Sequence, residues 1–137
     1  MTHVSIATGG SRKTVLTGHV LSGIVILFLL IDAGMKLAVL QPVVEASRQL
    51  GWPADGATVR MLGLVLLICT ILYAVPRTAV LGALLLTAFL GGAVATHARI
   101  GSPLFSHVLF GVYVGVLMWG GLWLRDERVR ALLPFAA

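Results

Sequence analysis

An acid and an amine lie four residues apart inside the first long apolar segment of the chain. Asp32 and Lys36 interrupt a run of apolar residues that begins near Val15. In an α-helix this spacing puts both side chains on one face, and an acid on the N-terminal side of a lysine is the more favourable order. Each ionisable group inside a membrane helix costs about 2.5–3.5 kcal/mol, so the pair is the first candidate for a functional site. The alternative is a structural pair whose charges only neutralise each other.

Further polar residues stand at the ends of the other apolar segments: Arg60, His97, Arg99 and His107. If consecutive helices run in opposite directions, all of these residues reach the same side of the membrane as the acid and the amine. We therefore expect one ligand-binding site there, with these members: Asp32, Lys36, His97, Arg60 and Arg99. Such a site suits a carbonyl, carboxylate or phosphate group on a lipophilic molecule whose body lies between the helices. For the two arginines, the alternative is that they extend to the lipid headgroups.

In an enzymatic version of this site, Asp32 or His97 would exchange a proton with a bound carbonyl group while Lys36 polarises it. The catalytic residues stay unknown at this stage, because the sequence contains no nucleophile elbow, phosphate-binding loop or zinc-protease motif. We expect no metal site either. His19 lies near the opposite end of its helix, and His97 and His107 have no carboxylate or cysteine at ligand spacing.

The composition places these residues in a membrane protein. Of the 137 residues, 58% are hydrophobic and 11% are charged, which is far from the balance of a soluble protein. Four apolar segments have the length of about 20 residues that a bilayer requires: residues 15–40, 57–75, 78–98 and 104–124. They are apolar all round, so they do not alternate as the strands of a membrane barrel would. The sequence predicts an all-α, four-helix, antiparallel membrane bundle.

The connecting segments refine this picture. Residues 1–14 are predicted to form a flexible tail, and residues 125–137 a charged, amphipathic one. Pro42 can begin a short helix in the first loop, and one side of that helix is apolar, which is typical of a helix lying at the membrane surface. Gly51, Trp52 and Pro53 then end this interfacial helix and anchor it at the headgroups. Cys69 has no cysteine partner, so we expect a small packed residue.

Basic residues predict the orientation, because they concentrate on the cytoplasmic side of membrane proteins. The side with both termini would carry Arg12, Lys13, Arg77, Arg125, Arg128 and Arg130, and the other side Lys36, Arg48, Arg60 and Arg99. We therefore expect both termini in the cytoplasm and the ligand site on the outward side. The net charge of +5 is explained by these helix ends, so no nucleic-acid partner is expected.

Small residues recur four apart in three of the predicted helices. The pairs are Gly18 with Ser22, Ala88 with Gly92, and Gly111 with Gly115. Helices in lipid associate where small side chains let their backbones approach. We interpret these pairs as packing seams within one bundle, and a homodimer interface is the alternative.

Several local motifs occur together in a fixed order: Gly34-x-Lys36, Gly51-Trp52-Pro53, Pro76, Gly82-Ala83, Ala95-Thr96-His97, Gly101 and Pro103. With four predicted membrane helices in so short a chain, this set resembles the DoxX-like family of small bacterial membrane proteins. The resemblance covers residues from about Leu16 to Leu124. It implies a four-helix bundle in the bacterial inner membrane. Since the family's namesake is similar to a membrane subunit of a thiosulfate:quinone oxidoreductase, it also implies contact with a quinone as the possible cofactor.

One feature departs from that family pattern. Many members carry an acidic residue within the second helix, where this chain has Leu64, Val65, Leu66 and Leu67. The departure puts shared proton chemistry in doubt.

The leading hypothesis is an integral membrane protein that binds a quinone-like lipophilic molecule at the outward polar site, as part of a redox system. The second hypothesis is an accessory or structural subunit of a larger membrane complex, in which the polar cluster only fixes helix register. A transporter comes third, because the four segments contain no evident inverted repeat or pair of broken helices.

Overall fold

The computed structural model describes residues 12–133, and these residues contain helices and no strands. The elements are α1 (Arg12–Leu37), α2 (Gln41–Gln49), α3 (Gly56–Ala74), α4 (Ala79–Arg99), the π-helix η1 (Leu104–Val108), α5 (Phe110–Arg125) and α6 (Glu127–Leu132). Four segments are long and apolar enough to cross a membrane: α1, α3, α4, and η1 together with α5. The predicted four-helix membrane bundle is confirmed, and the chain is a multi-pass membrane protein.

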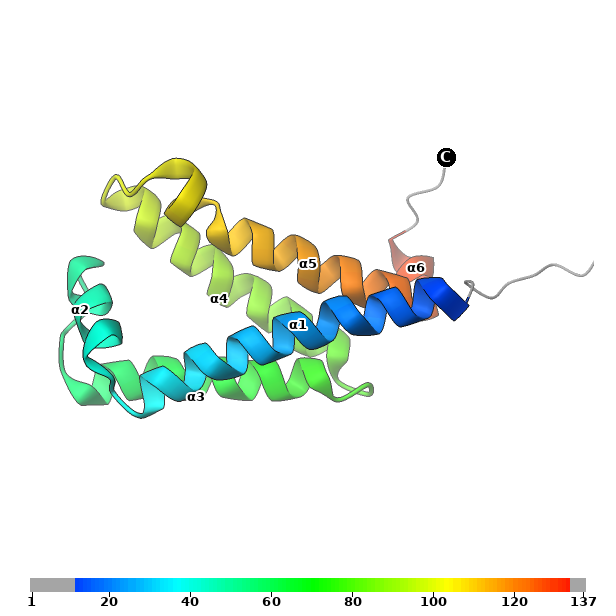
Figure 1. The fold of residues 1–137 in the computed structure, drawn as a ribbon, viewed down its shortest axis with the longest axis horizontal. Helices are drawn as coiled ribbons and strands as arrows, with labels where there is room; N and C mark the ends of the chain where they lie inside the picture. The colour runs from blue at the N-terminus through cyan, green and yellow to red at the C-terminus, as the bar shows by residue number, and fades with distance from the viewer. Residues whose placement is uncertain (1–11, 134–137) are drawn as a thin grey trace, which may run out of the picture.

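The long helices form a ring in which each packs against two others, in the order α1, α3, α4, α5 and back to α1. Figure 1 shows that the pair α1 and α3 lies close to the pair α4 and α5 at one end, beside α6, and diverges from it toward the other end, where α2 lies. We call these the α6 end and the α2 end. The bundle therefore has one closed end and one splayed end.

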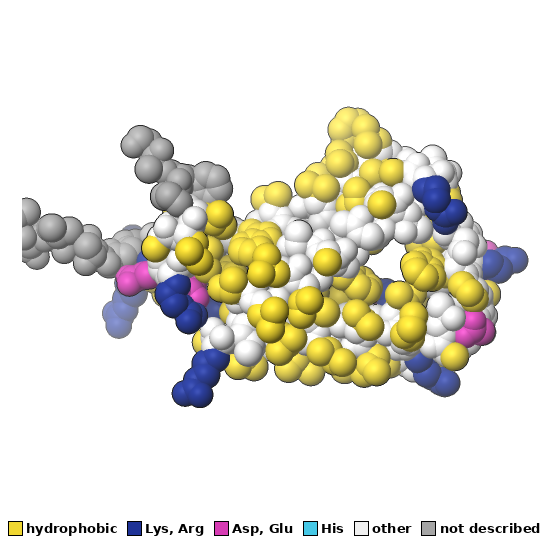
Figure 2. Space-filling model, turned by 180° about the vertical axis from the view of Figure 1, so that it is seen from behind, with side chains coloured by type: hydrophobic (Ala, Val, Ile, Leu, Met, Phe, Trp, Pro, Cys, Tyr) yellow, Lys and Arg dark blue, Asp and Glu magenta, His cyan; other side chains and the backbone are white. Residues whose placement is uncertain are grey.

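Each helix buries a narrow stripe and leaves its other faces apolar and exposed. In α1 the buried residues are Gly18, Ser22, Val25, Leu29 and Ala33, which recur every three or four positions. Large hydrophobic side chains cover much of the surface between the two ends (Figure 2). Because lipid is as apolar as these side chains, close packing rather than water exclusion must hold the helices together.

Glycines provide that close packing. A Cβ on Gly18 would lie 2.8 Å from the carbonyl oxygen of Gly121, and a Cβ on Gly121 would lie 2.7 Å from Oγ of Ser22. Gly111 likewise packs on α4, where a Cβ would lie 2.9 Å from Val94. The seam predicted at Gly18 and Ser22 is thus confirmed. Of the predicted pair Gly111 and Gly115, only Gly111 packs against another helix, because a Cβ on Gly115 would meet no atom within 4 Å. The seam predicted at Gly92 is wrong, because a Cβ there would meet no atom within 4 Å.

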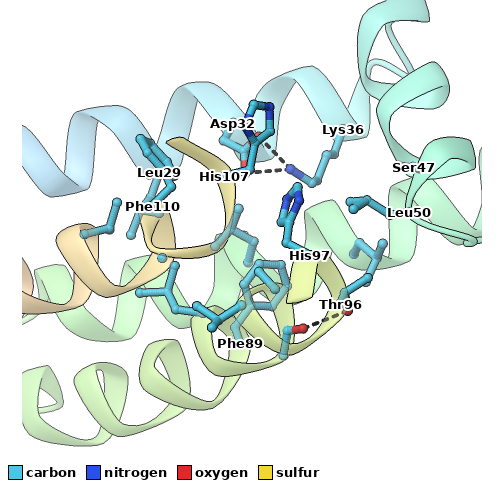
Figure 3. Close-up of a pocket in the computed structure, with 18 of the residues that line it drawn as sticks. Leu29, Asp32, Lys36, Ser47, Leu50, Phe89, Thr96, His97, His107 and Phe110 are labelled. Atoms are coloured by element: carbon cyan, nitrogen blue, oxygen red, sulfur yellow. Dashed lines mark hydrogen bonds and ion pairs between the residues drawn. The ribbon is translucent and has the colours of Figure 1, made fainter. Parts of the chain in front are cut away.

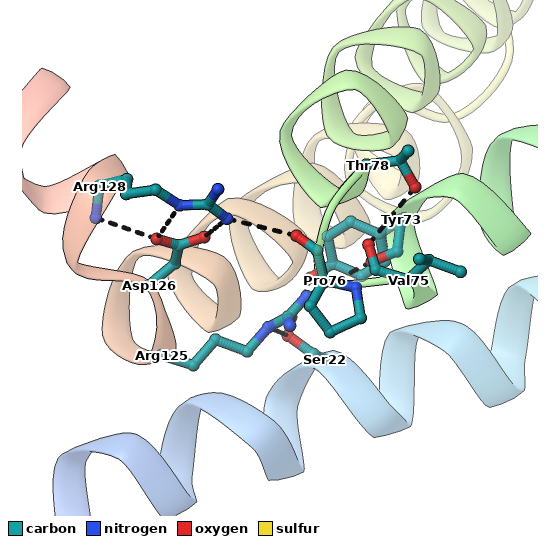
Figure 4. Close-up of polar contacts among 8 residues, drawn as sticks. All are labelled: Ser22, Tyr73, Val75, Pro76, Thr78, Arg125, Asp126 and Arg128. Atoms are coloured by element: carbon teal, nitrogen blue, oxygen red, sulfur yellow. Dashed lines mark hydrogen bonds and ion pairs between the residues drawn. The ribbon is translucent and has the colours of Figure 1, made fainter.

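A buried hydrogen-bond network joins three helices near the α6 end (Figure 4). The hydroxyl of Tyr73, a fully buried residue of α3, donates to the carbonyl of Met118 in α5 at 2.8 Å and lies 2.9 Å from Oγ of Ser22 in α1. Nε of Arg125 donates to the same serine at 3.0 Å, and its guanidinium lies 5.3 Å from the centre of the tyrosine ring. Each polar group therefore has a partner where no water is at hand.

The turn between α3 and α4 is tied to the helix that follows α5. Asp126 is the N-cap of α6, and its carboxylate accepts a hydrogen bond from the backbone N–H of Arg128. The same carboxylate pairs with the Arg128 guanidinium at 2.8 Å. These hydrogen bonds lower the pKa of the Asp126 carboxyl group. The same guanidinium donates to the carbonyl of Pro76 in the turn. As far as residue 133, the charged tail predicted after Leu124 therefore packs on the α6 end and connects the end of α5 to the turn between α3 and α4.

Three boundaries differ from those predicted. Helix α1 already includes residues 12–14, which were assigned to the flexible tail; residues 1–11 and 134–137 lie outside the described part of the chain. The first span ends at Leu37 instead of Leu40, and Val39 has a φ of 52°, which a β-branched residue rarely adopts. The fourth span is not one α-helix, because Pro103 begins a π-helical turn before α5 starts at Phe110.

The closed end gives a direct test of this packing. Gly82 of α4 lies against the backbone of Tyr73, so that even one added methyl group would overlap it. We expect Gly82→Ala to destabilise the protein by about 1–3 kcal/mol, the usual cost of overpacking a core. Gly120→Ala is the control, since a Cβ there meets no atom within 4 Å. Thermal unfolding in detergent measures both variants, and equal melting temperatures would contradict the proposed contact.

Candidate functional site

The divergence of the helices leaves a cavity of about 450 Å³ near the α2 end. Residues from every element except α6 line it, and most of them are apolar. The polar side chains in its wall are Asp32, Lys36, Ser47, Thr96, His97 and His107. An apolar cavity with a few polar groups that converge on one region is the usual form of a small-molecule site.

The Asp32–Lys36 pair lies on the last turns of α1 and faces this cavity (Figure 3). The Lys36 ammonium lies 2.6 Å from both carboxylate oxygens of Asp32. Gly63 makes room for the pair, because a Cβ on this glycine would lie 2.7 Å from Cβ of Lys36. The side chains are 17% exposed for Lys36 and 35% exposed for Asp32, so the amine is the more enclosed partner. Two of its three N–H groups are used, and the third is available to a ligand.

Two histidines face the pair from the other half of the bundle. Their rings lie 5.7 Å apart, with His97 on the last turns of α4 and His107 in η1. Nδ1 of His97 is 3.1 Å from Oγ of Ser102, and Nδ1 of His107 is 2.7 Å from Oγ of Ser106. Each serine thus holds one ring nitrogen and leaves Nε2 as the atom that can reach a ligand. Figure 3 shows both rings on the side of the cavity that faces Asp32 and Lys36.

Helix α2 lies across the splayed end of the bundle and contributes Ser47 to the cavity wall, and the segment that follows it contributes Leu50 and Trp52. A hydrogen bond from Nη2 of Arg99 to the carbonyl of Leu50, at 2.7 Å, fastens the end of α2 to the end of α4. Gly51 allows this contact, because its φ is 82° and a Cβ would lie 2.9 Å from the arginine. The predicted helix stop at Gly51 is confirmed. The glycine lets Arg99 reach the carbonyl of Leu50, and this contact holds α2 over the end of the cavity.

The structure brings together three of the five predicted site residues. Asp32, Lys36 and His97 line the cavity, whereas Arg60 and Arg99 do not. Nε of Arg60 donates to the carbonyl of Leu37 at 3.4 Å, at the C-terminal end of α1. Arg99 holds α2, as described above. The two arginines therefore contact backbone carbonyls around the cavity and do not contribute to its wall.

The sequence-based site left out three polar wall residues, Ser47, Thr96 and His107, and of these only His107 has an ionisable side chain. Its position at the start of the fourth span was visible in the sequence, as was the break at Gly101, Ser102 and Pro103. The π-helical turn that brings the His107 ring close to His97 could not be predicted from the sequence. Periodicity assigns a residue to a helix face only where the helix is regular.

The sides of the cavity between the helices differ. On the side of α1 and α5, Phe28 and Phe110 meet with ring centres 5.5 Å apart, and both line the cavity. The opposite face, formed by α3 and α4, is hollowed at the α2 end, as Figure 2 shows. The aromatic pair therefore partly closes one side and leaves the other open.

These groups supply hydrogen bonds and protons. In the described part of the chain, no three His, Cys, Asp or Glu side chains come together as metal ligands. One ammonium, one carboxylate and two imidazoles can donate to, or accept from, an oxygen-bearing group, and histidine can change its charge near neutral pH. The apolar wall can hold the rest of such a molecule.

The ion pair can be tested without a ligand. Asp32→Asn alone should destabilise the protein by about 1–3 kcal/mol, because it leaves the Lys36 ammonium without its counter-charge in a poorly hydrated site. Lys36→Met alone should have a similar effect. The double variant should recover most of the loss, because it removes both charges together. Thermal unfolding of the four proteins in detergent measures this coupling, and strictly additive losses would show that the pair is not a unit.

Comparison with known proteins fits this architecture. No curated protein and no solved structure matches the chain. The model of the DoxX-like family matches residues 20–121, which include α3 and α4, most of α1 and α5, and the whole polar wall of the cavity. The resemblance seen in the sequence is therefore confirmed, and the chain belongs to the DoxX-like family.

Proposed function

We propose that this protein binds a small lipophilic molecule, of which a quinone is the leading example, in the cavity at the α2 end. The observation that carries the proposal is the meeting of the Asp32–Lys36 pair with His97 and His107 in one otherwise apolar cavity. Charged groups inside a membrane bundle are costly, and they are usually retained where they serve a ligand or ion. The family likeness supports a membrane role but does not specify the ligand.

In the proposed complex, the polar and the apolar side chains of the cavity wall contact different parts of the ligand. A ring carbonyl would accept a hydrogen bond from the third N–H of Lys36 or from Nε2 of a histidine. The ring itself would pack on apolar residues such as Leu66 and Phe89. Since Asp32 neutralises the lysine, the site has no net charge while both histidines are neutral. It therefore suits an uncharged head with oxygen acceptors better than a free anion.

In a redox system, the protein's own contribution would be to position this head and to exchange protons with it. Reduction of a quinone to a quinol takes up two electrons and two protons. His97 or Asp32 would first take up protons from outside the cavity and then pass two of them to the carbonyl oxygens. Lys36 would polarise the carbonyl groups, and a separate redox protein would supply the two electrons.

We also propose that the protein lies in the bacterial inner membrane with both termini in the cytoplasm. The charges support this orientation. The α6 end carries six basic and two acidic residues, and the α2 end carries four basic and three acidic residues. The excess of positive charge at the α6 end favours the cytoplasmic side for that end. The ligand cavity would then lie in the outward half of the bilayer.

An accessory subunit of a larger membrane complex, or a homodimer, is the second candidate. A shallow apolar groove on the outer faces of α4 and α5 supports it, lined in part by Gly91, Gly115 and Trp119. A Cβ on either glycine would meet no atom within 4 Å, so another helix could approach the backbone there.

Ligand binding is tested with Lys36→Met. We expect the purified wild-type protein in detergent to bind a benzoquinone that carries a ten-carbon chain, and Lys36→Met to bind it about tenfold or more weakly, the effect of losing a hydrogen bond from a charged group. Arg48→Gln is the matched control, because Arg48 forms an exposed ion pair with Glu45 at the same end and does not line the cavity. Quenching of tryptophan fluorescence can report binding.

The outcomes separate the two candidates. Equal affinities for Lys36→Met and the wild type would contradict the proposed site. A protein partner that co-purifies in stoichiometric amounts and is unaffected by Lys36→Met would favour the subunit instead.

A further inference from the structure

The cavity is closed toward both ends of the bundle. At the α6 end its floor is formed by buried side chains, which include Leu29, Leu66 and Leu90. At the α2 end it is covered by α2, which Arg99 fastens to α4. A ligand that came from water on that side would have to displace α2. The remaining openings lie between the helices and face the bilayer.

One of these openings is a mouth between α3 and α4. Its wall includes Leu62 on α3, and Phe89, Gly92 and Ala93 on α4, all of which also line the cavity. Figure 2 shows the hollow on this face. A Cβ on Gly92 would meet no atom within 4 Å, although the glycine is part of the cavity wall. The position predicted from sequence to be a helix seam is therefore an unfilled part of the mouth.

The volume limits what can lie inside. A cavity of about 450 Å³ is at the lower end of the range for sites that enclose a drug-sized molecule. It can hold a ring with small substituents next to the polar groups, but it cannot also hold a hydrocarbon chain as long as those of membrane lipids. A chain of that length attached to the ring must leave the cavity, and Leu62, Phe89 and Ala93 at the mouth offer it apolar contacts.

We infer that the ligand is a lipid-like molecule whose polar head lies beside Lys36, His97 and His107 and whose hydrocarbon chain passes through the mouth between α3 and α4 into the bilayer. This inference rests on the proposed function and adds the route of the chain. It makes the ligand a resident of the membrane, not a solute that enters from water. It also assigns Gly92 a role, which is to keep the mouth free.

The test blocks the mouth and compares two probes. One is a benzoquinone with a hydrocarbon chain as long as those of membrane lipids, and the other is the same benzoquinone head without the chain. In Gly92→Leu the new side chain occupies the mouth. We expect the variant to bind the chain-bearing probe about tenfold or more weakly, because the chain and the leucine compete for one space, and to bind the head alone within about twofold of the wild type.

Gly23→Leu is the matched control. It is the same substitution in a membrane helix, at a glycine whose Cβ would also meet no atom within 4 Å and which does not line the cavity. It should leave both affinities unchanged. Ala93→Leu narrows the same mouth from the neighbouring position and should reproduce the selective loss, so the test does not depend on one variant.

Each other outcome contradicts a defined part of the argument. If Gly92→Leu weakens both probes equally, or neither, the chain does not pass through this mouth and the inference is wrong, while the head-binding site stands. If Gly23→Leu has the same selective effect, the weaker binding of the chain-bearing probe does not come from the mouth, because Gly23 does not line the cavity. That result would overturn the inference. If the wild type binds neither probe, the proposed function fails, and the inference fails with it.

Discussion

Charges that lie between membrane helices must be satisfied by protein groups, and in this chain that requirement shapes the α2 end. Asp32 and Lys36 neutralise each other across one turn of α1, with both carboxylate oxygens 2.6 Å from the ammonium. Placed on a lipid-facing surface, the pair would cost several kcal/mol with nothing in return. Placed beside a cavity, it keeps one N–H free and meets two histidines. The splayed form of the bundle leaves free space beside these groups.

The two ends of the bundle differ in their side chains: one end is tightly packed and the other contains the cavity. At the α6 end, glycines bring backbones into contact, and Tyr73, Ser22 and Arg125 connect three helices by hydrogen bonds. At the α2 end, where α1 and α3 diverge from α4 and α5, larger side chains such as Phe28, Phe89 and His97 line a cavity between the helices. Helix α2 then spans the gap. The α6 end therefore holds the four helices together. A ligand in the cavity at the α2 end would not disturb the packed core at the α6 end.

The long elements of this fold could be predicted from the sequence because membrane helices leave a strong signal. Length, hydropathy and the breaks at Gly and Pro located four helices, the short helix after Pro42 and the turn at Gly51. The ordered motifs identified the family. The convergence of Asp32, Lys36 and His97 also followed, since alternating helices bring their ends to one level. The remaining features depend on geometry that periodicity does not encode: the π-helical turn that aims His107 at His97, the backbone carbonyls that accept from Arg60 and Arg99, and the divergence that leaves Gly92 facing a cavity and not a helix.

The last of these features has the widest consequence. A small residue in a membrane helix has two possible meanings, close approach of another helix or space for something else, and the sequence alone cannot separate them. Gly111 and Gly92 differ in this way: a Cβ on the first would lie 2.9 Å from Val94, whereas a Cβ on the second would meet no atom within 4 Å. Packing explains the first glycine completely. For the second, the free space is continuous with the polar cavity, so a molecule that enters from the lipid phase would encounter the open wall at Gly92 before it reached the charges. In the proposed function, the polar groups and the free space at Gly92 are therefore parts of one site, and an amphipathic lipid that enters head first would pass Gly92 before its head reaches the charges.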